Sequence, residues 1–271
     1  MDITAILTIA AKEFRDRIRN RWVLAVALVF TVFALVIAYF GGAQQGAVGF
    51  RSIEFTIASL VSLVIYLIPL IALLLGFDAI VGERERGSLE LLLSLPITRF
   101  ELLIGKYLGL AGALALSTVL GFGLVAAVLA TQMGGDALAH YAAFTLSSVL
   151  LGMAFLSIAV MLSVFAGDRT RASGLAIAVW FFFVLIFDLL LLGALVVTGG
   201  QYGGELFPYL LLLNPADVFR VLNIFSLDEV RSLYGLATVF PEALARAWVL
   251  MLVMGAWIAA PIALAAWRFR K

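Results

Sequence analysis

Six long stretches of the sequence are almost free of charged residues, and this limits the possible folds more than any other feature. Each stretch is close to the ~20 residues that a helix needs to cross a bilayer. They are Trp22–Phe40, Phe55–Val81, Tyr107–Thr131, Ala139–Ala166, Ala172–Thr198 and Ala245–Trp267. Charged residues make up 13% of the chain, about half of the ~25% that is usual in soluble domains. The sequence therefore predicts an integral membrane protein.

These stretches are expected to form helices. An alternation of period two, the mark of a transmembrane β-barrel, is nowhere sustained, and a lipid-embedded backbone must satisfy its own hydrogen bonds. We therefore predict an all-α integral membrane protein, a single transmembrane domain over residues 1–271 with six transmembrane helices.

The distribution of basic residues predicts the orientation of the chain. If the N-terminus is cytoplasmic, the inside segments hold 14 of the 18 Lys and Arg residues. These are Lys12, Arg15, Arg17, Arg19, Arg21, Arg84, Arg86, Arg99, Lys106, Arg169, Arg171, Arg268, Arg270 and Lys271. Because positive charge collects on the cytoplasmic side, both termini are expected there, and an even number of spans agrees with this.

The first 21 residues are expected to form an amphipathic helix at the cytoplasmic membrane interface. Apolar residues recur there at helical spacing, with most charges on the other side of the helix. The apolar positions are Ile3, Ile6, Leu7, Ala10, Phe14 and Ile18. The segment is too long and too charged for the start of a cleaved signal peptide. A simple anchor without a further role is the alternative interpretation.

Residues 199–244 form the one sizeable outer segment, predicted to be periplasmic and to contain two short helices. Asn214 and Pro215 match the N-cap and first position of a helix, with Asp217 in its first turn. Ser226–Glu229 matches a capping box and marks the second helix. Two amphipathic helices of this kind either rest on lipid or bind a periplasmic protein. The expected partner contacts are Asn214, Pro215, Asp217, Phe219 and Arg220.

The segment between the second and third spans, residues 82–106, is predicted to form an elbow. The helix of the second span is expected to continue through four alternating charges, Glu83, Arg84, Glu85 and Arg86. Gly87 can close it in the left-handed conformation. Ser88 is placed to cap a short helix over Leu89–Ser94, and Pro96 disfavours helical geometry at Leu95. Thr98–Glu101 is a capping box that starts the next helix.

The short helix of the elbow is expected to bury Leu89, Leu92 and Leu93 on one side. This side either lies on lipid headgroups or docks a cytoplasmic partner. The charges at 83–86 would then set the orientation of that partner, because charges at the edge of an interface contribute more to specificity than to affinity.

The run ERERGSLELLLSLPITRFELLIGK, Glu83–Lys106, resembles the signature of the permeases of ABC exporters of the second class. In that family this turn is a coupling helix that sits in a groove of the ATPase subunit. The loop with Asp168, Arg169 and Arg171 is similar to the family's second cytoplasmic loop. The resemblance implies a homodimer in the bacterial inner membrane with two copies of a cytoplasmic ATPase.

Within that class, Leu213–Ile224 is most similar to permeases that serve nitrous oxide reductase maturation. This resemblance implies a periplasmic accessory protein and a role in assembling the copper–sulfur centre of that enzyme, with a sulfur species as the transported substrate.

Several chemistries are not expected of the chain. A phosphate-binding loop needs G-x-x-x-x-G-K-[ST], whereas Phe100 and Tyr107 stand at the first Gly and hydroxyl positions around Gly105–Lys106. ATP and magnesium should therefore be bound by a separate subunit, and this chain is not expected to be an enzyme or to hold a cofactor. With no Cys and one His, no metal site is expected, and no nucleic acid partner is indicated.

Asp188, near the middle of the fifth span, is the candidate polar residue inside the membrane. A charge at this depth costs roughly 2.5–3.5 kcal/mol on insertion scales, so the side chain should face protein or a cavity. It is either a satisfied structural group or part of a substrate path or subunit interface. Two functions of other classes remain open: a non-transporting scaffold or sensor that docks a signalling protein, and an ion-driven secondary carrier.

Overall fold

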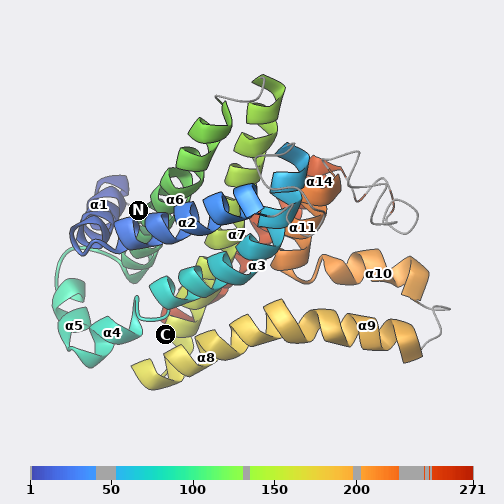
Figure 1. Ribbon diagram of the computed structural model, residues 1–271. Coiled ribbons are helices and arrows are strands. Elements are labelled where there is room, and N and C mark those ends of the chain that lie inside the picture. Colours follow the sequence, from blue (N-terminus) through green and yellow to red (C-terminus); the bar gives the residue numbers. More distant parts are fainter. Residues whose placement is uncertain are drawn as a thin grey trace.

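The computed structural model describes residues 2–40, 53–130, 135–197, 203–225, 241, 244 and 246–270, and the regular structure within them is helical (Figure 1). The helices are α1 Ile3–Arg19, α2 Trp22–Phe40, α3 Ile53–Gly76, α4 Val81–Glu85, α5 Ser88–Leu93, α6 Arg99–Ala130, α7 Gly135–Phe165, α8 Arg169–Phe181, the π-helical turn η2 Phe182–Ile186, α9 Phe187–Val197, α10 Gly203–Leu211, α11 Pro215–Phe225 and α14 Ala247–Phe269. The all-α prediction is confirmed for the described part of the chain.

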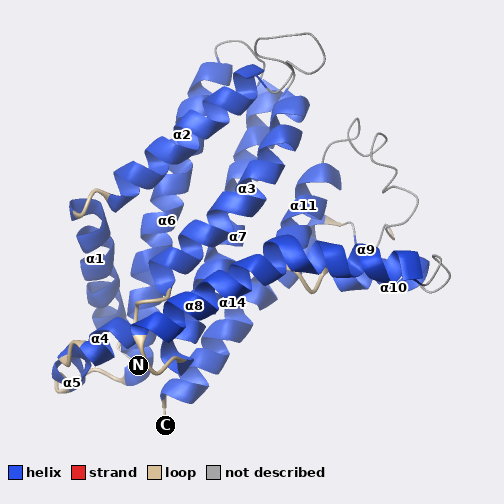
Figure 2. Ribbon diagram, turned by 60° about the horizontal axis from the view of Figure 1, so that its bottom comes forward, coloured by secondary structure: helices blue, strands red, loops and turns tan. Residues whose placement is uncertain are grey.

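Helix α7 lies at the centre of the bundle and packs against α3, α6, α11 and α14. The buried hydroxyls of Ser148 and Ser157 on α7 donate to carbonyls of their own helix, so these two polar groups are paired inside the core. Around it, α2 and α1 cover α6. Figure 2 shows α1, α4, α5 and both ends of the chain at one end of the bundle, which we call the basal end.

Five described segments are long and apolar enough to cross a membrane: Thr56–Glu85, Arg99–Ala127, Leu138–Phe165, Arg169–Ala194 and Ala247–Phe269. A sixth is counted if α1 and α2, bent by 63° at their junction, make one span. The sequence prediction instead gave α2 a span of its own and laid α1 along the interface. The direction in which the chain crosses the membrane stays a prediction.

The helix of the second span was expected to continue without interruption into the elbow, but the structure interrupts it. It breaks between α3 and α4, over residues 77–80. The amides of Ile80 and Val81 donate instead to the buried hydroxyl of Ser163 on α7, at 2.9 and 3.0 Å. This hydroxyl replaces carbonyls of the preceding turn, so the break in the helix leaves neither of these two amides unpaired.

Glycines on α6 allow α1 to approach closely. A Cβ at Gly105 would lie 2.7 Å from the Cβ of Ile9, and one at Gly109 would lie 2.5 Å from the carbonyl oxygen of Ala10. Small residues at this spacing let helices approach closely, and here the partner of α6 is α1. In contrast, a Cβ at Gly255 on α14 would meet nothing within 4 Å.

We predict that Gly109→Ala destabilises the protein by about 1–3 kcal/mol, because the added methyl group forces α1 away from α6. Gly123→Ala on the same helix is the matched control, since a Cβ there meets nothing within 4 Å. The control should be neutral or stabilising by up to about 1 kcal/mol through helix propensity. Thermal unfolding of the two purified variants measures the difference, and equal midpoints would contradict the close approach of α1.

The fifth span and the segment after it extend away from the bundle. Figures 1 and 2 both show α9 and α10 lying side by side and projecting outward, while α11 turns back into the bundle. Helix α10 was not predicted from the sequence. The helix that was predicted from Ser226 lies outside the described residues.

Candidate functional site: the elbow and its anchors

The local structure of the elbow follows the capping signals in its sequence. Gly87 separates α4 from α5 with φ of 70°, the left-handed conformation that glycine adopts without strain. Helix α5 ends at Leu93, before Pro96. In the capping box, the Thr98 amide donates to Glu101 at 2.8 Å and the Glu101 amide donates to the Thr98 hydroxyl at 3.2 Å. Two stops and a new helix start therefore lie where they were predicted.

Ser88 has a role different from the predicted one. It is the first residue of α5, and no side chain caps that helix. Its hydroxyl instead donates to the Glu83 carboxylate and lies 3.3 Å from the Glu83 carbonyl oxygen. Ser88 thus joins the two arms of the elbow across Gly87 and stiffens the turn.

The elbow and the residues just before it contact the segment Asp168–Arg171, at the start of α8, in two places. The Glu85 carboxylate accepts a 2.8 Å hydrogen bond from the backbone amide of Arg169, at the start of α8. The Arg169 guanidinium pairs with Asp78, just before α4, at 2.7 Å. Asp168 is the N-cap of α8 and accepts from the Arg171 amide at 2.7 Å. The two charged loops identified in the sequence therefore form one surface.

A buried ion triad ties the elbow to the N-terminal helix. The Lys106 ammonium on α6 lies 2.8 Å from Glu13 on α1 and 3.0 Å from Glu83 on α4. The three side chains are only 4%, 9% and 15% exposed. The start of α1 is held as well, because the Asp2 amide donates to Glu101 at 2.6 Å. Hydrogen bonds from Thr4 lower the pKa of the Asp2 carboxyl, which caps α1.

The leucines of α5 are not arranged as predicted. Leu89 is 9% exposed and joins the core of the bundle, and Leu92 and Leu93 are half-buried against it. The outward residues are Leu91, which is 72% exposed, and Leu95, which is 54% exposed. The side of α5 with Leu89, Leu92 and Leu93, which was predicted to face a partner, therefore packs against the bundle of this chain. Any partner of the elbow would therefore meet Leu91 and Leu95.

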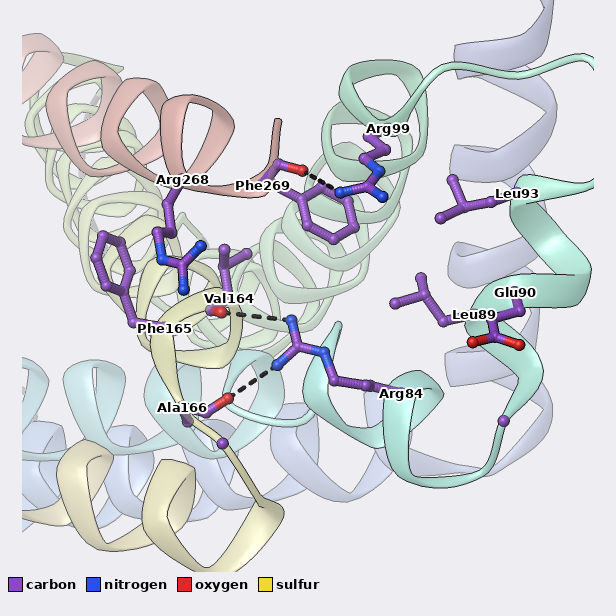
Figure 3. Close-up of a pocket in the computed structure, with 12 residues that line it drawn as sticks. Arg84, Leu89, Glu90, Leu93, Arg99, Val164, Phe165, Ala166, Arg268 and Phe269 are labelled. Carbon is purple, nitrogen blue, oxygen red and sulfur yellow. Dashed lines mark hydrogen bonds between the residues drawn. The ribbon is translucent and has the colours of Figure 1, made fainter. Parts of the chain in front are cut away.

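A cavity of about 490 Å³ opens behind the elbow, between α5 and the last turns of α7 and α14 (Figure 3). The Arg84 guanidinium donates to the carbonyl oxygens of Ala166 and Val164 at 3.0 and 3.5 Å, and Arg99 donates to that of Phe269 at 3.0 Å. Because the last carbonyls of a helix lack intrahelical partners, these arginines stabilise the ends of α7 and α14 and attach the elbow to them.

Asp188 lies on α9 and forms a polar cluster with α11. Arg220 donates to Asp188 at 3.0 Å and to Asp217 at 2.5 Å. The Asn214 amide donates to Asp217 and to the Phe183 carbonyl of the π-helical turn, both at 2.8 Å. The expectation that Asp188 faces protein or a cavity is confirmed. A hollow of about 140 Å³, lined otherwise by apolar residues, adjoins Asp188 and Arg220.

The outer-segment residues that were predicted to bind a periplasmic partner are mostly buried within the chain. Asn214 and Asp217 are each 1% exposed and Phe219 is fully buried. Pro215 is buried too, and Arg220 is partly exposed but occupied by its two carboxylates. Asn214 is the predicted N-cap, accepting from the Ala216 amide. The capping signal was correct, but it belongs to a helix that packs against α3, α7 and α14, so the prediction of a partner surface here is wrong.

We predict a favourable coupling between Asp188 and Arg220 of roughly 1 kcal/mol, the order of a polar contact between membrane helices. Both side chains are about one-third exposed, 38% and 34%, which keeps the expected value low. A double-mutant cycle with Asp188→Asn and Arg220→Gln measures it through thermal unfolding. Leu190→Ala, on the exposed side of α9, is the control. Additive effects would show that the contact contributes nothing.

Within the described part of the chain, no three His, Asp or Glu side chains gather closely enough to hold a metal ion. At the basal end, the elbow is a stiff turn whose side chains are bonded to α1, α6, α7, α8 and α14. Such a turn can transmit displacement from outside the bundle to several helices together.

Comparison with known proteins shows the family of the chain. The model of the ABC-2 family transporter proteins matches residues 7–271. The chain belongs to this family and is a membrane component of an ABC transporter. It is similar to a protein of Stutzerimonas stutzeri named "probable ABC transporter permease protein NosY", with 45% identity over 270 residues and 98% of both chains covered. A protein of the same name from Pseudomonas aeruginosa is 46% identical over 272 residues, again with 98% of both chains covered.

Two sets of site residues were not anticipated from the sequence. Lys106 was counted only as a basic residue of an inside segment, and neither Glu13 nor Ser163 was singled out. A lysine surrounded by glycine and apolar residues at the start of a span was the available signal, since a buried ammonium needs a carboxylate partner. Ser163 left no signal, because serine is common in apolar helices.

Proposed function

We propose that this chain is the permease subunit of an ATP-driven ABC transporter, acting as a homodimer with two copies of a cytoplasmic ATPase subunit. The basal end would then be cytoplasmic, with α5 as the coupling helix and α1 lying along the interface. ATP hydrolysis, with its magnesium, belongs to the ATPase. The observation that carries the proposal is the elbow, which is held by several helices while Leu91 and Leu95 point outward.

The anchoring contacts explain why such an elbow can drive transport. When a partner pushes on α5, the Arg84 and Arg99 contacts carry the displacement to the ends of α7 and α14. Glu85 carries it to the start of α8, and through the π-helical turn to Asp188. One input surface would thus move several spans, as alternating access requires.

We propose that the transporter moves a sulfur species across the inner membrane, for assembly of the copper–sulfur centre of nitrous oxide reductase. The support is the likeness to two permeases named NosY, over nearly the whole chain. Asp188 and Arg220, beside their small hollow, are the proposed polar point on the path. A periplasmic accessory protein would bind at the end of the bundle opposite the elbow.

Coexpression with an ABC ATPase subunit from the same organism, followed by purification from detergent, tests the proposal. The expected product is a complex of two permease and two ATPase chains whose ATP hydrolysis changes when the permease is present. Purification of the chain alone under conditions that preserve its folded dimer would contradict the permease role and favour a scaffold or an ion-driven carrier.

A further inference from the structure

Three arginines from different parts of the chain surround the basal cavity. Arg84 comes from α4, Arg99 from the start of α6 and Arg268 from the last turn of α14, and Figure 3 shows their guanidinium groups around a common space. The cavity also has apolar walls, formed by Leu89, Leu93, Val164, Phe165 and Phe269. At about 490 Å³ it is many times larger than the ~30 Å³ of a water molecule.

The charge of this cavity is unbalanced. Within the described residues, Arg84, Arg99 and Arg268 form no ion pair with a carboxylate, and Glu90 is the one acidic residue of the lining. The carbonyl contacts of Arg84 and Arg99 use only part of the five N–H donors of each guanidinium. Donors therefore remain for an anion, and an arginine fork matches the geometry of phosphate oxygens.

The cavity lies at the depth of the lipid headgroups. Helix α14 has 23 residues and a length of about 34 Å, slightly more than the ~30 Å hydrocarbon core. Its last turn therefore reaches the membrane surface. Trp267, beside Arg268, is 56% exposed, and exposed tryptophans mark the interface between lipid and water. Basic pockets between membrane helices at this level bind anionic headgroups.

We propose that this cavity binds the phosphate headgroup of an anionic phospholipid. The phosphate would pair with Arg268 and with the free donors of Arg84 and Arg99, while Leu93 and Phe165 contact the glycerol and the first part of the acyl chains. Such a lipid would bridge α4, α6 and α14 and complete the attachment of the elbow to the bundle. The inference depends on the membrane environment and not on what the protein transports.

Native mass spectrometry of the full-length protein, titrated with phosphatidylglycerol or phosphatidylcholine, tests the proposal. We expect one phosphatidylglycerol to be retained per chain in preference to phosphatidylcholine. Arg268→Gln should weaken this binding about fivefold, the factor expected for one basic residue at an anionic surface, and Arg268→Lys should retain most of it. Arg15→Gln removes an exposed basic residue of α1, away from the cavity, and should leave the binding unchanged.

Equal retention of the two lipids, or equal effects of Arg268→Gln and Arg15→Gln, would overturn the proposal. Competition by inorganic phosphate at the same concentration as the lipid would assign the cavity to a free anion. A photoreactive residue at position 268 that labels an acidic protein segment and no lipid would assign it to a protein partner. Labelling of phospholipid from that position is the supporting result.

Discussion

Replacing Lys106 by methionine is expected to destabilise the folded protein by about 3–5 kcal/mol, the cost of removing one partner from a buried ion pair. The variant leaves the Glu13 and Glu83 carboxylates next to each other, nearly without water and without their shared cation. The two groups would repel each other, and α1 would separate from α4. We expect a markedly lower midpoint of thermal unfolding and loss of the ordered elbow in hydrogen exchange.

Two further variants distinguish the triad from a general effect of charge. Lys12→Met removes a lysine that is 59% exposed and lies 3.4 Å from Glu13, and its effect should be within about 1 kcal/mol. The variant that combines Glu13→Gln, Lys106→Met and Glu83→Gln carries no buried charge and should recover most of the lost stability. If Lys106→Met is as stable as Lys12→Met, the triad does not hold the elbow.

Signals confined to a few neighbouring residues were read correctly from the sequence. Gly87, the Thr98–Glu101 capping box and the N-cap at Asn214 all depend on backbone groups within one helical turn of the side chain. The long apolar runs likewise define their helices, because a lipid-embedded backbone has no other way to pair its N–H and C=O groups. Such contacts can be inferred without knowing where other segments lie.

The errors concern which side of a helix faces the rest of the chain. Helix α5 has four leucines in six residues, so spacing alone cannot say which of them the bundle covers. The apolar face of α11 was assigned to a partner, although α3, α7 and α14 cover it. The break before α4 depends on Ser163, more than eighty residues away in the sequence. Each of these is decided by contacts between distant segments.

Replacing Leu91 by aspartate should release the ATPase subunit while the permease still inserts and unfolds at its normal temperature. Leu91 is 72% exposed, so the substitution removes nothing from the core of this chain. In a complex with the ATPase, full burial of this side chain would contribute about 1.5–3 kcal/mol, and the new carboxylate would have to be buried without a partner. We expect pull-down of the ATPase to fall by at least about tenfold, which corresponds to ~1.4 kcal/mol.

Leu89→Asp provides the opposite result and thereby separates docking from folding. Leu89 is 9% exposed and packs within the bundle, so an aspartate there should lower the yield and thermal stability of the permease itself. Leu91→Asp should leave both unchanged. Because the two substitutions place the same charge two positions apart on α5, a difference between them reports orientation and not helix propensity. If Leu91→Asp retains the ATPase fully, with normal coupled hydrolysis, α5 is a helix that lies on the lipid surface. The ATPase would then dock on the segment Asp168–Arg171 at the start of α8.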